Sequence, residues 1–360
     1  MPVDIELLNV NDIKAWNDYA KQHDLSMFNC SIQFRFFLIR LFGIGCTPFY
    51  LVAKEEGKIV GILPSFVKHG KFGPVLNSLP WFGSNPGVLA DSEKIKIMLI
   101  QRFCDIARWT NCVSATFISN PFGEDFLYDV FFDEYNQAKL FVDSRIGMIT
   151  RIPEYTNDEE FDKTVMALVH QKTRNQIKKS IQHGITIEGC DGGDFNWIKN
   201  THSDNMKAIG APYKEREFEI IKDQLMYGED YKIFTNVAHE NMGNVTMAGL
   251  LLKYFNKTVD YMIPALDVNF RHYDPLHVVI LDAMRDAAQR GFKYWNWGGT
   301  TIPGQEGVYH FKKRFGAEES IYKYYTLIFE PAILRKSKEE LLEYYKYFYV
   351  VPFQNLESAT

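Results

Sequence analysis

Residues 246–299 read TMAGLLLKYFNKTVDYMIPALDVNFRHYDPLHVVILDAMRDAAQRGFKYWNWGG, and their pattern determines the architecture that we expect. Two apolar runs predict successive strands, and a polar loop then leads into an amphipathic helix. Gly291 ends this helix, because glycine readily adopts the left-handed conformation of a helix C-cap. The elements are the strands 246–254 and 258–265, the loop 267–275, the helix 276–290 and the strand 293–297.

The neighbouring sequence extends this unit in both directions. A basic helix and further strands and helices precede it, and a short helix and a strand ending near residue 328 follow. No GxGxxG motif is present and the order of elements is not βαβ, which argues against a dinucleotide-binding fold. The flanking elements are helix 161–183, strand 185–188, helices 195–208 and 215–226, strand 232–238, helix 308–314 and a last helix that Ser337 and Glu340 begin as a capping box.

The first half of the chain repeats this plan. Helices at 12–22 and 32–41 precede a hairpin of strands 49–53 and 59–67, joined by the turn 55–58; a loop at 78–91, a helix at 92–109 and a strand at 113–118 follow. The two halves meet near 148–160, where Pro153 and an acidic run interrupt both patterns. We therefore expect an α/β protein with mixed sheets, divided into residues 1–150, 151–328 and a C-terminal helical segment 329–360, with a ligand crevice in or between the two lobes.

Composition limits the possible functions. The 360 residues are 46% hydrophobic and 24% charged, with 28 Phe, 20 Tyr and 6 Trp, which is enough apolar area for two cores and excludes general disorder. A net charge of −5 argues against a surface that is basic throughout and coats nucleic acid. Five cysteines without a CxxC pair argue against a disulfide framework or thiolate zinc site. An acidic N-terminal stretch and the lack of long apolar runs predict a cytoplasmic protein without a transmembrane segment.

A basic segment, KTRNQIKK at 172–179, is the first candidate binding site. Helical spacing places Lys172 with Lys179 on one face and Arg174 with Lys178 on another. Such a stripe suits a polyanion, and an arginine can grip a phosphate with two parallel hydrogen bonds. The alternative is a solvated helix face whose charge the preceding acidic residues balance, namely Asp158, Glu159, Glu160 and Asp162.

Two further clusters contain residues that could contact a ligand. Polar residues gather where the strand 258–265 ends and the helix 276–290 begins, and backbone N–H groups at such a helix start can hold an anion. Downstream, Gly298 and Gly299 follow a strand, so a ligand can approach the backbone closely. The ordinary alternatives are a polar surface loop and a turn beside a packed aromatic face. The sequence contains no Ser-His-Asp order, HExxH spacing or Walker loop, so neither a covalent intermediate nor a metal is expected.

Taken in order, these motifs resemble the Fem-type aminoacyltransferases of peptidoglycan bridge synthesis and their relatives in the GCN5-related N-acetyltransferase (GNAT) superfamily. The resemblance covers roughly residues 45–325 and implies two tandem GNAT-like domains, with the final segment packing back on the first. The segments that carry it are GILPSFVKHGKFGPVLNSLPWFGSNPGVLAD (61–91), QKTRNQIKKSIQHGITI (171–187), NMKAIGAPYKEREFE (205–219), residues 248–299 and GVYHFKKRFGAE (307–318).

The resemblance implies an acyl or aminoacyl transfer onto an amine of a nucleotide-linked or lipid-linked cell-envelope precursor, by direct attack in a ternary complex. The acceptor would be anionic, and no cofactor would be bound permanently. Asp267 and Tyr309 would be catalytic, with Asp267 or a water chain taking the amine proton. An acceptor diphosphate or other anion would face Lys172, Arg174, Asn175 and Lys178. The residues that would line the crevice of the second domain are Tyr261, Asp267, Arg271, Tyr273, Asn296, Gly298, Gly299, Tyr309, Phe311 and Lys312.

The donor stays open between aminoacyl-tRNA and acyl-CoA. CoA-dependent relatives cradle pyrophosphate with a glycine-rich loop before the long helix, but here that loop, DVNFRHYDP at 267–275, has no glycine; Gly83 and Gly87 of the first half do not form the pattern either. The long helical-hairpin arm of some bridge-forming members is also absent. The alternatives are therefore an acyl-CoA-dependent acetyltransferase of an amino sugar and a non-catalytic module that binds a glycan precursor or a partner. A lipid-linked acceptor would imply peripheral membrane contact.

Overall fold

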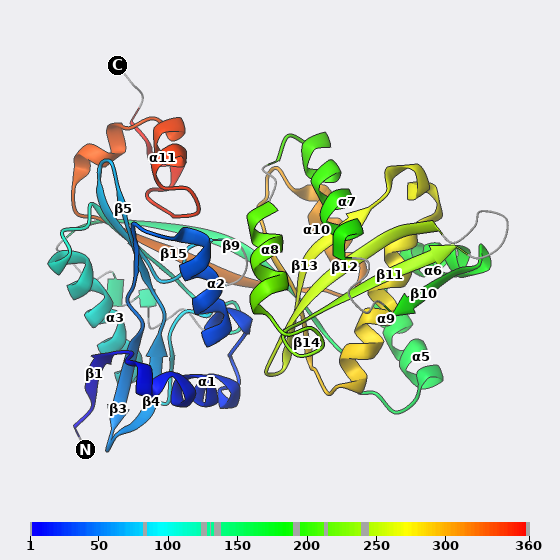
Figure 1. The fold of residues 1–360 in the computed structure, drawn as a ribbon, viewed down its shortest axis with the longest axis horizontal. Helices are drawn as coiled ribbons and strands as arrows, with labels where there is room; N and C mark the ends of the chain where they lie inside the picture. Colours follow the sequence, from blue (N-terminus) through cyan, green and yellow to red (C-terminus); the bar gives the residue numbers. More distant parts are fainter. Residues whose placement is uncertain are drawn as a thin grey trace. The chain divides into compact units, whose positions relative to one another are not determined.

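The chain forms two units, which the ribbon in Figure 1 shows coloured along the sequence. Unit 1 comprises Met1–Ile146 and Ser320–Thr360, and unit 2 comprises Gly147–Glu319. The chain enters unit 2 within strand β9 (Lys139–Arg151) and leaves it within β15 (Glu318–Ile328). This computed structural model describes residues 2–81, 85–123, 128–129, 131–132, 138–189, 195–211, 215–238 and 245–357. Gly83 of the predicted loop lies outside the described residues.

Unit 2 is built on a sheet with the strand order β10-β11-β12-β13-β14. Neighbouring strands are antiparallel from β10 to β13, whereas β13 and β14 are parallel. The parallel pair aligns only Thr258–Asp260 with Tyr294–Asn296, although both strands are described over their full length, so they separate toward their carboxyl ends. The strands are β10 (Ile185–Gly189), β11 (Tyr231–Ala238), β12 (Val245–Phe255), β13 (Thr258–Leu266) and β14 (Tyr294–Thr300).

Helices pack against this sheet. The long helix α9 begins with Pro275, which suits a first helical turn because that turn needs no backbone N–H from it. Helix α7 lies so close to β12 that a Cβ atom at Gly249 would come within 2.9 Å of Ile198 Cγ1. Any larger residue would therefore push the helix from the sheet. The helices are α5 (Asp158–Leu168), α6 (Gln171–Gln182), α7 (Phe195–Ala208), α8 (Glu215–Gln224), α9 (Pro275–Gln289) and α10 (Glu306–Arg314), with the 3₁₀ helix η3 at Val268–Tyr273.

The prediction of a single basic helix at 161–183 is wrong, because two helices, α5 and α6, cover this part of the chain. Helix α5 ends before Val169, whose backbone is extended (φ −76°, ψ 136°) and whose side chain is buried. His170 then begins α6, since its Nδ1 accepts a hydrogen bond from the backbone N–H of Lys172 at 3.2 Å. A buried β-branched residue followed by a capping side chain breaks the helix here.

Unit 1 contains two groups of strands. The first is the antiparallel sheet β1-β3-β4-β7, and the second has the order β15-β8-β6-β5-β2, in which only β6 and β8 are parallel. The strand predicted at 59–67 is wrong: Pro64 cannot donate to a ladder, and β4 and β5 on either side of it join different sheets. The strands are β1 (Asp4–Leu7), β2 (Cys46–Pro48), β3 (Leu51–Glu55), β4 (Lys58–Leu63), β5 (Phe66–Gly70), β6 (Gly73–Asn77), β7 (Leu89–Ala90) and β8 (Ser114–Ile118).

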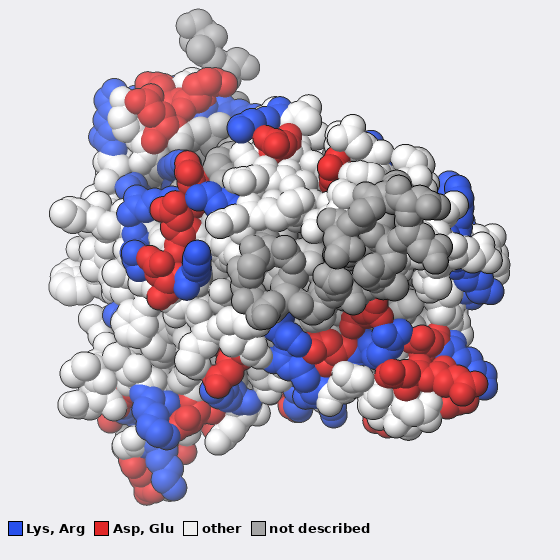
Figure 2. All heavy atoms as spheres, turned by 45° about the vertical axis from the view of Figure 1, so that its right-hand side comes forward, with Lys and Arg blue, Asp and Glu red and all other residues white. Residues whose placement is uncertain are grey.

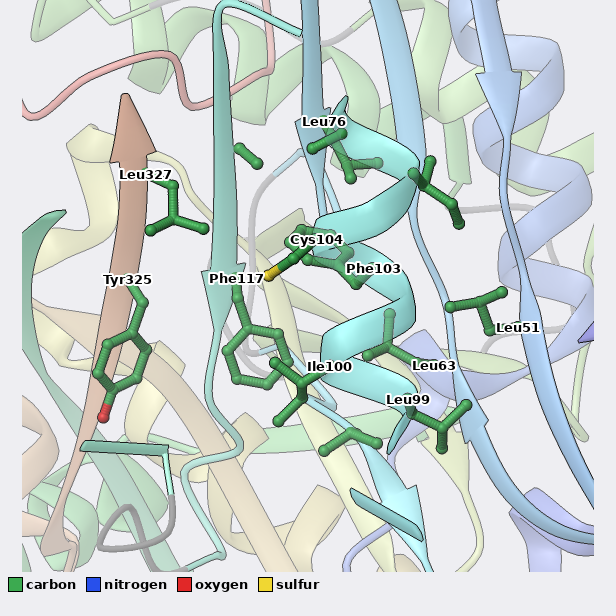
Figure 3. Packing of buried hydrophobic residues seen from close by; sticks show 14 of the residues in the cluster. Leu51, Leu63, Leu76, Leu99, Ile100, Phe103, Cys104, Phe117, Tyr325 and Leu327 are labelled. Atoms are coloured by element: carbon green, nitrogen blue, oxygen red, sulfur yellow. The ribbon is translucent and has the colours of Figure 1, made fainter. Parts of the chain in front are cut away.

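Helix α3 (Glu93–Trp109) forms the centre of the unit 1 core. Ser92 caps it, with Oγ accepting from the Ile95 N–H at 3.4 Å. Figure 3 shows the α3 side chains, including Leu99 and Phe103, among those of the neighbouring strands, and both are fully buried. The remaining helices of this unit are α1 (Ile13–Gln22), α2 (Ile32–Phe42) and α11 (Lys338–Tyr344).

The C-terminal segment belongs to unit 1 and packs on β6. Tyr345 donates from its hydroxyl to Gly73 O at 2.8 Å and accepts from the Phe72 N–H at 2.9 Å. The capping box predicted for the last helix is confirmed, because Ser337 and Glu340 bond each other's backbone N–H groups. Within the part of the chain that the structure describes, no helix has both the length and the apolarity needed to cross a bilayer.

Candidate functional site

Lys312 of α10 is a buried cation at the carboxyl end of β14. Its Nζ donates to Thr300 Oγ1 at 2.8 Å, to Gly299 O at 3.0 Å and to Gly298 O at 3.3 Å. The residue is 5% exposed, and burial lowers the pKa of its ammonium to about 8. Among the described residues no carboxylate lies within ion-pair distance of Nζ. A lysine that is desolvated but uncompensated can stabilise negative charge or exchange a proton near neutral pH.

The strand end that holds Lys312 owes its shape to Gly298. This residue has φ +74°, a left-handed conformation that favours glycine. Its N–H donates to Asn296 Oδ1 at 3.0 Å, so an amide side chain fixes the turn. Because β13 pairs with β14 only as far as Asn296, the backbone of Gly298 and Gly299 has no partner on the β13 side. The predicted site residues Asn296, Gly298, Gly299 and Lys312 are thus brought together.

Aromatic rings form the wall beside this turn. Trp297 lies 5.0 Å from Tyr261 and 6.0 Å from Phe311 between ring centroids. Its indole N–H donates to Thr150 Oγ1 at 2.9 Å, which fixes the ring. Burial raises the pKa of Tyr261, so its phenol stays protonated. Tyr261 and Phe311, both predicted site residues, therefore contribute to one apolar face through Trp297.

The two predicted catalytic residues have different surroundings. Tyr309 of α10 donates from its hydroxyl to Glu319 Oε1 at 2.6 Å, and this bond raises the pKa of the phenol. Asp267 begins η3, and its Oδ1 accepts from the Asn269 N–H at 3.0 Å. In the described residues no hydrogen bond or ion pair joins Asp267 to Lys312. Their assignment as catalytic stays a prediction.

Tyr273 of η3 lies against the end of α6. The Tyr273 ring is 5.2 Å from that of His183, and its carbonyl accepts from Ser180 Oγ at 2.5 Å. Arg271 is exposed. The start of α9 joins this region to α10, because the His277 ring lies 5.7 Å from Phe311.

The basic stripe on α6 faces outward. The helix buries Thr173, Ile177 and Ser180, and Lys172 and Lys178 lie on its exposed side. Arg174 turns back, donating to Met166 O at 3.1 Å and to Gln171 Oε1 at 2.5 Å. Asn175 Oδ1 accepts from the same Gln171 at 2.8 Å. Arg174 would have to exchange these contacts before it could grip a phosphate.

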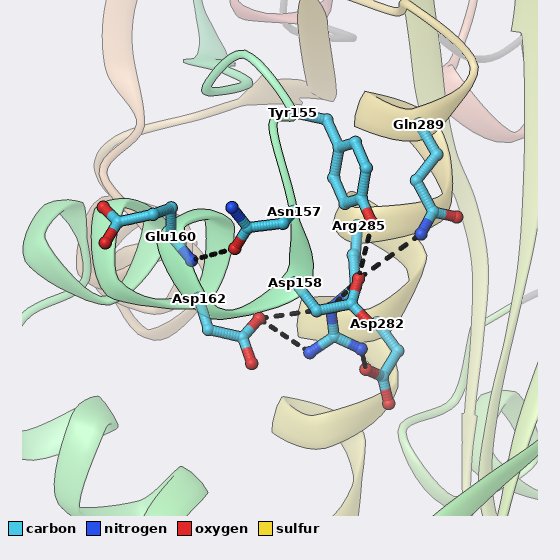
Figure 4. A network of polar contacts seen from close by, with 8 residues as sticks. All are labelled: Tyr155, Asn157, Asp158, Glu160, Asp162, Asp282, Arg285 and Gln289. Atoms are coloured by element: carbon cyan, nitrogen blue, oxygen red, sulfur yellow. Dashed lines mark hydrogen bonds and ion pairs between the residues drawn. The ribbon is translucent and has the colours of Figure 1, made fainter.

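The acidic run before α6 does not balance the stripe. Figure 4 shows Asp158 and Asp162 turned toward Arg285 of α9, and Arg285 Nη2 bonds Asp162 Oδ1 at 2.7 Å. Arg285 also pairs with Asp282 on its own helix. These carboxylates pair with Arg285 and so join α5 to α9. Lys172 and Lys178 therefore have no acidic partner among the described residues.

Surface charge elsewhere is mixed. On the face drawn in Figure 2, Lys and Arg side chains alternate with Asp and Glu, and the described residues there form no continuous basic area. Sequence reasoning placed His277 in the polar cluster at the start of α9 but missed Thr300 and the pair Lys253 and Asp260. A lysine inside the apolar strand 246–254, opposite an aspartate in the next strand, was the available signal.

Comparison with protein families gives one match. Residues 196–323 match the model of the FemAB family. None of the curated protein sequences matches the chain significantly.

Solved structures with the same fold cover nearly the whole chain. The crystal structure of FemX has a TM-score of 0.72 at 14% identity over 91% of this chain and 98% of its own. A tandem GNAT protein from the clavulanic acid biosynthesis pathway has a TM-score of 0.52 at 10% identity over 92% and 99%. L-PGS from Bacillus licheniformis has a TM-score of 0.52 at 10% identity over 89% and 92%. The expected α/β class with mixed sheets is confirmed, and the chain shares the fold of FemX and of the tandem GNAT protein.

Proposed function

We propose that the chain transfers an aminoacyl or acyl group to an amine of a nucleotide-linked or lipid-linked cell-envelope sugar or peptide precursor. The observation that carries the proposal is Lys312, a buried ammonium without a carboxylate partner at the end of a parted strand pair. Such a charge costs free energy unless a ligand uses it. The FemAB match covers residues 196–323, which include Lys312, and it supports acyl transfer as the reaction in which this charge acts.

The reaction follows from the groups at the turn. The acceptor amine attacks the acyl carbonyl carbon of the donor ester or thioester, and the carbonyl electron pair moves to oxygen. The Lys312 charge stabilises that oxyanion in a desolvated site, where electrostatic interactions are strong. The carbonyl then re-forms as the bond to the leaving group breaks, and the amide product results.

We assign to Asp267 the role of the base that takes the proton of the acceptor amine. One oxygen of its carboxylate already accepts from the Asn269 N–H, and its Oδ2 is left to take the proton that the amine loses. Tyr309 would return a proton to the leaving group, for which it must release Glu319. The surface cations Lys172 and Lys178 would attract the anionic acceptor, and the aromatic face of Tyr261, Trp297 and Phe311 would hold its apolar part.

We propose aminoacyl-tRNA, rather than acyl-CoA, as the donor at unit 2. Asp274 is the N-cap residue of α9, but its side chain makes no cap hydrogen bond and accepts instead from Gln176 Nε2 at 3.0 Å, so a carboxylate already lies beside the helix start. A diphosphate placed there would meet a carboxylate. The preceding segment is the glycine-free 3₁₀ helix η3 instead of an open loop. The CoA-dependent acetyltransferase of an amino sugar is the competing function.

The test is a transfer assay with defined substrates. Aminoacyl-tRNA or acetyl-CoA serves as donor, a UDP-linked muramoyl peptide or UDP-linked amino sugar serves as acceptor, and mass spectrometry detects the amide. We expect transfer from aminoacyl-tRNA, and Lys312→Met should lower it by about 10²–10³-fold. Lys313→Met is the matched control, since Lys313 is a neighbouring surface residue that pairs with Glu319 at 3.3 Å. Transfer from acetyl-CoA alone favours the competing function, and equal rates in both variants would remove Lys312 from the mechanism.

A further inference from the structure

A row of buried polar residues crosses three strands of unit 2. Lys253 of β12 lies opposite Asp260 of β13, and Asp260 lies beside Asn296 of β14 in the register. Residues at matched register positions project from the same face of a sheet, so the three side chains meet. The Lys253 side chain is 5% exposed and that of Asp260 13% exposed. Ionisable groups inside a sheet are uncommon and need a reason.

These side chains form a continuous chain of contacts. Lys253 Nζ lies 3.7 Å from Asp260 Oδ2, and the other carboxylate oxygen, Oδ1, accepts from Asn296 Nδ2 at 2.8 Å. The amide oxygen of Asn296 accepts from the Gly298 N–H at 3.0 Å. The carboxylate can only accept, so it fixes which way the amide points and leaves the amide oxygen toward Gly298.

This series of contacts ends at the two carbonyl groups that accept hydrogen bonds from Lys312. The carbonyls of Gly298 and Gly299 lie on the turn that Asn296 holds, and both accept from Lys312 Nζ. Gly298 has a left-handed backbone, and a Cβ atom built there would meet no atom within 4 Å. The hydrogen bond from its N–H to Asn296 is thus a side-chain contact that helps to fix this bend in β14, together with the bond from Lys312 to its carbonyl.

We propose that Lys253, Asp260 and Asn296 are positioning residues that set the β14 turn and thereby hold Lys312 for acyl transfer. The proposal rests on the proposed function, in which Lys312 acts on the oxyanion. Positioning matters there because a displacement of about 1 Å at a reacting group can cost about 10²-fold in rate.

Stability alone does not explain the ion pair. Burial raises the pKa of Asp260 and lowers that of Lys253, and the attraction between the two charges opposes both shifts. Replacement of such a pair by apolar side chains of similar volume is often neutral or stabilising. A pair that is not needed for stability, but whose carboxylate orients a catalytic turn, fits a positioning role.

The experiment uses the double variant Lys253→Met/Asp260→Leu. The apolar pair fills the same space without leaving a buried charge, but Asn296 loses its anchor. We expect an unfolding temperature close to wild type and a less ordered turn that admits water to Lys312. Trace labelling with acetic anhydride across a range of pH, read by mass spectrometry, reports the titration of each lysine without any substrate.

In the wild type the Lys312 midpoint should lie near 8, the value to which burial lowers its pKa. In the double variant it should rise by about one unit toward the free-lysine value, because the entering water solvates the ammonium. If the double variant folds and its Lys312 titration midpoint is unchanged or lower, the proposal is overturned.

If the double variant does not fold, the variant Asn296→Ala, which keeps the ion pair, takes its place. Its Lys312 midpoint must show the same rise, and a midpoint equal to that of the wild type overturns the proposal.

Two controls separate this result from other effects. Lys232→Met removes a lysine that pairs with Asp286, which keeps Arg290 as a partner at 3.4 Å, so the Lys312 titration should not change. Acyl transfer is measured separately. If Lys312→Met transfers normally, Lys312 has no role in the mechanism, and if no donor supports transfer, the proposed function fails; in both cases the labelling result still decides whether the row positions Lys312.

Discussion

The polar groups buried in the two units differ in kind. In unit 1, Thr116 of β8 and Thr326 of β15 are buried and share a hydrogen bond of 3.1 Å between neutral hydroxyls. Beside β14 of unit 2 the buried groups are ionisable, namely Lys253, Asp260 and Lys312. Hydroxyls are cheap to bury when paired, whereas charges are expensive. The difference supports the proposal that the reaction takes place in unit 2.

The largest expected effect is on the packing of unit 1. Phe103→Ala should lower the free energy of unfolding by about 3–5 kcal/mol, since it leaves a cavity beside Phe117, whose ring centroid is 6.2 Å away. Urea unfolding followed by circular dichroism measures the loss. The matched control is Trp109→Ala at the end of the same helix, where the side chain is 72% exposed and the loss should be small. Equal losses in the two variants would contradict the described core.

We expect the stability of unit 2 to depend more on charge than the stability of unit 1 does. The variant Arg285→Met tests this expectation. Arg285 is the shared partner of Asp162 and Asp282, and burial raises the pKa of Asp282 while Arg285 opposes that rise. Removing the guanidinium should cost about 1–3 kcal/mol at neutral pH. The deficit should shrink as the pH falls, because protonated carboxylates no longer need the positive partner.

Urea unfolding at neutral and at acidic pH measures this dependence. Lys163→Met, which removes a surface pair with Glu160 at 3.6 Å, is the control and should cost little at either pH. A deficit for Arg285→Met that is the same at both pH values would mean that the network acts through packing instead of charge.

The sequence reveals the elements of both units better than it reveals their contacts. The apolar runs and the helix end at Gly291 predicted the β13–α9–β14 segment, because these sequence signals are local. The break at Val169 was not predicted, since only burial makes that residue extended. The role of Asn296 was also out of reach, because its partner Asp260 becomes a neighbour only when β13 and β14 pair. Long-range pairing is what the sequence does not disclose.

A third prediction concerns the pH dependence of transfer. Lysine is charged below its pKa, which burial lowers to about 8 for Lys312, so the oxyanion-stabilising charge is lost as the pH rises through this value. We expect the rate to fall by about tenfold per unit above it. In Lys312→Arg the fall should disappear, because arginine keeps its charge throughout this range, although the rate itself is lower. A pH–rate profile of both proteins measures this, and an identical fall in Lys312→Arg would assign the titration to another group.

The smallest effect is expected at the surface of α6. The double variant Lys172→Glu/Lys178→Glu reverses two exposed charges that have no acidic partner among the described residues, and it should weaken binding of UDP by several-fold. Isothermal titration at low and high salt measures the change. Because both side chains point into solvent, salt should screen most of it. Lys207→Glu on α7, where Lys207 pairs with Asp204 at 3.6 Å, is the control for charge at a distance from α6. A loss that survives high salt would instead indicate direct contact with the diphosphate, which the outward direction of Lys172 and Lys178 argues against.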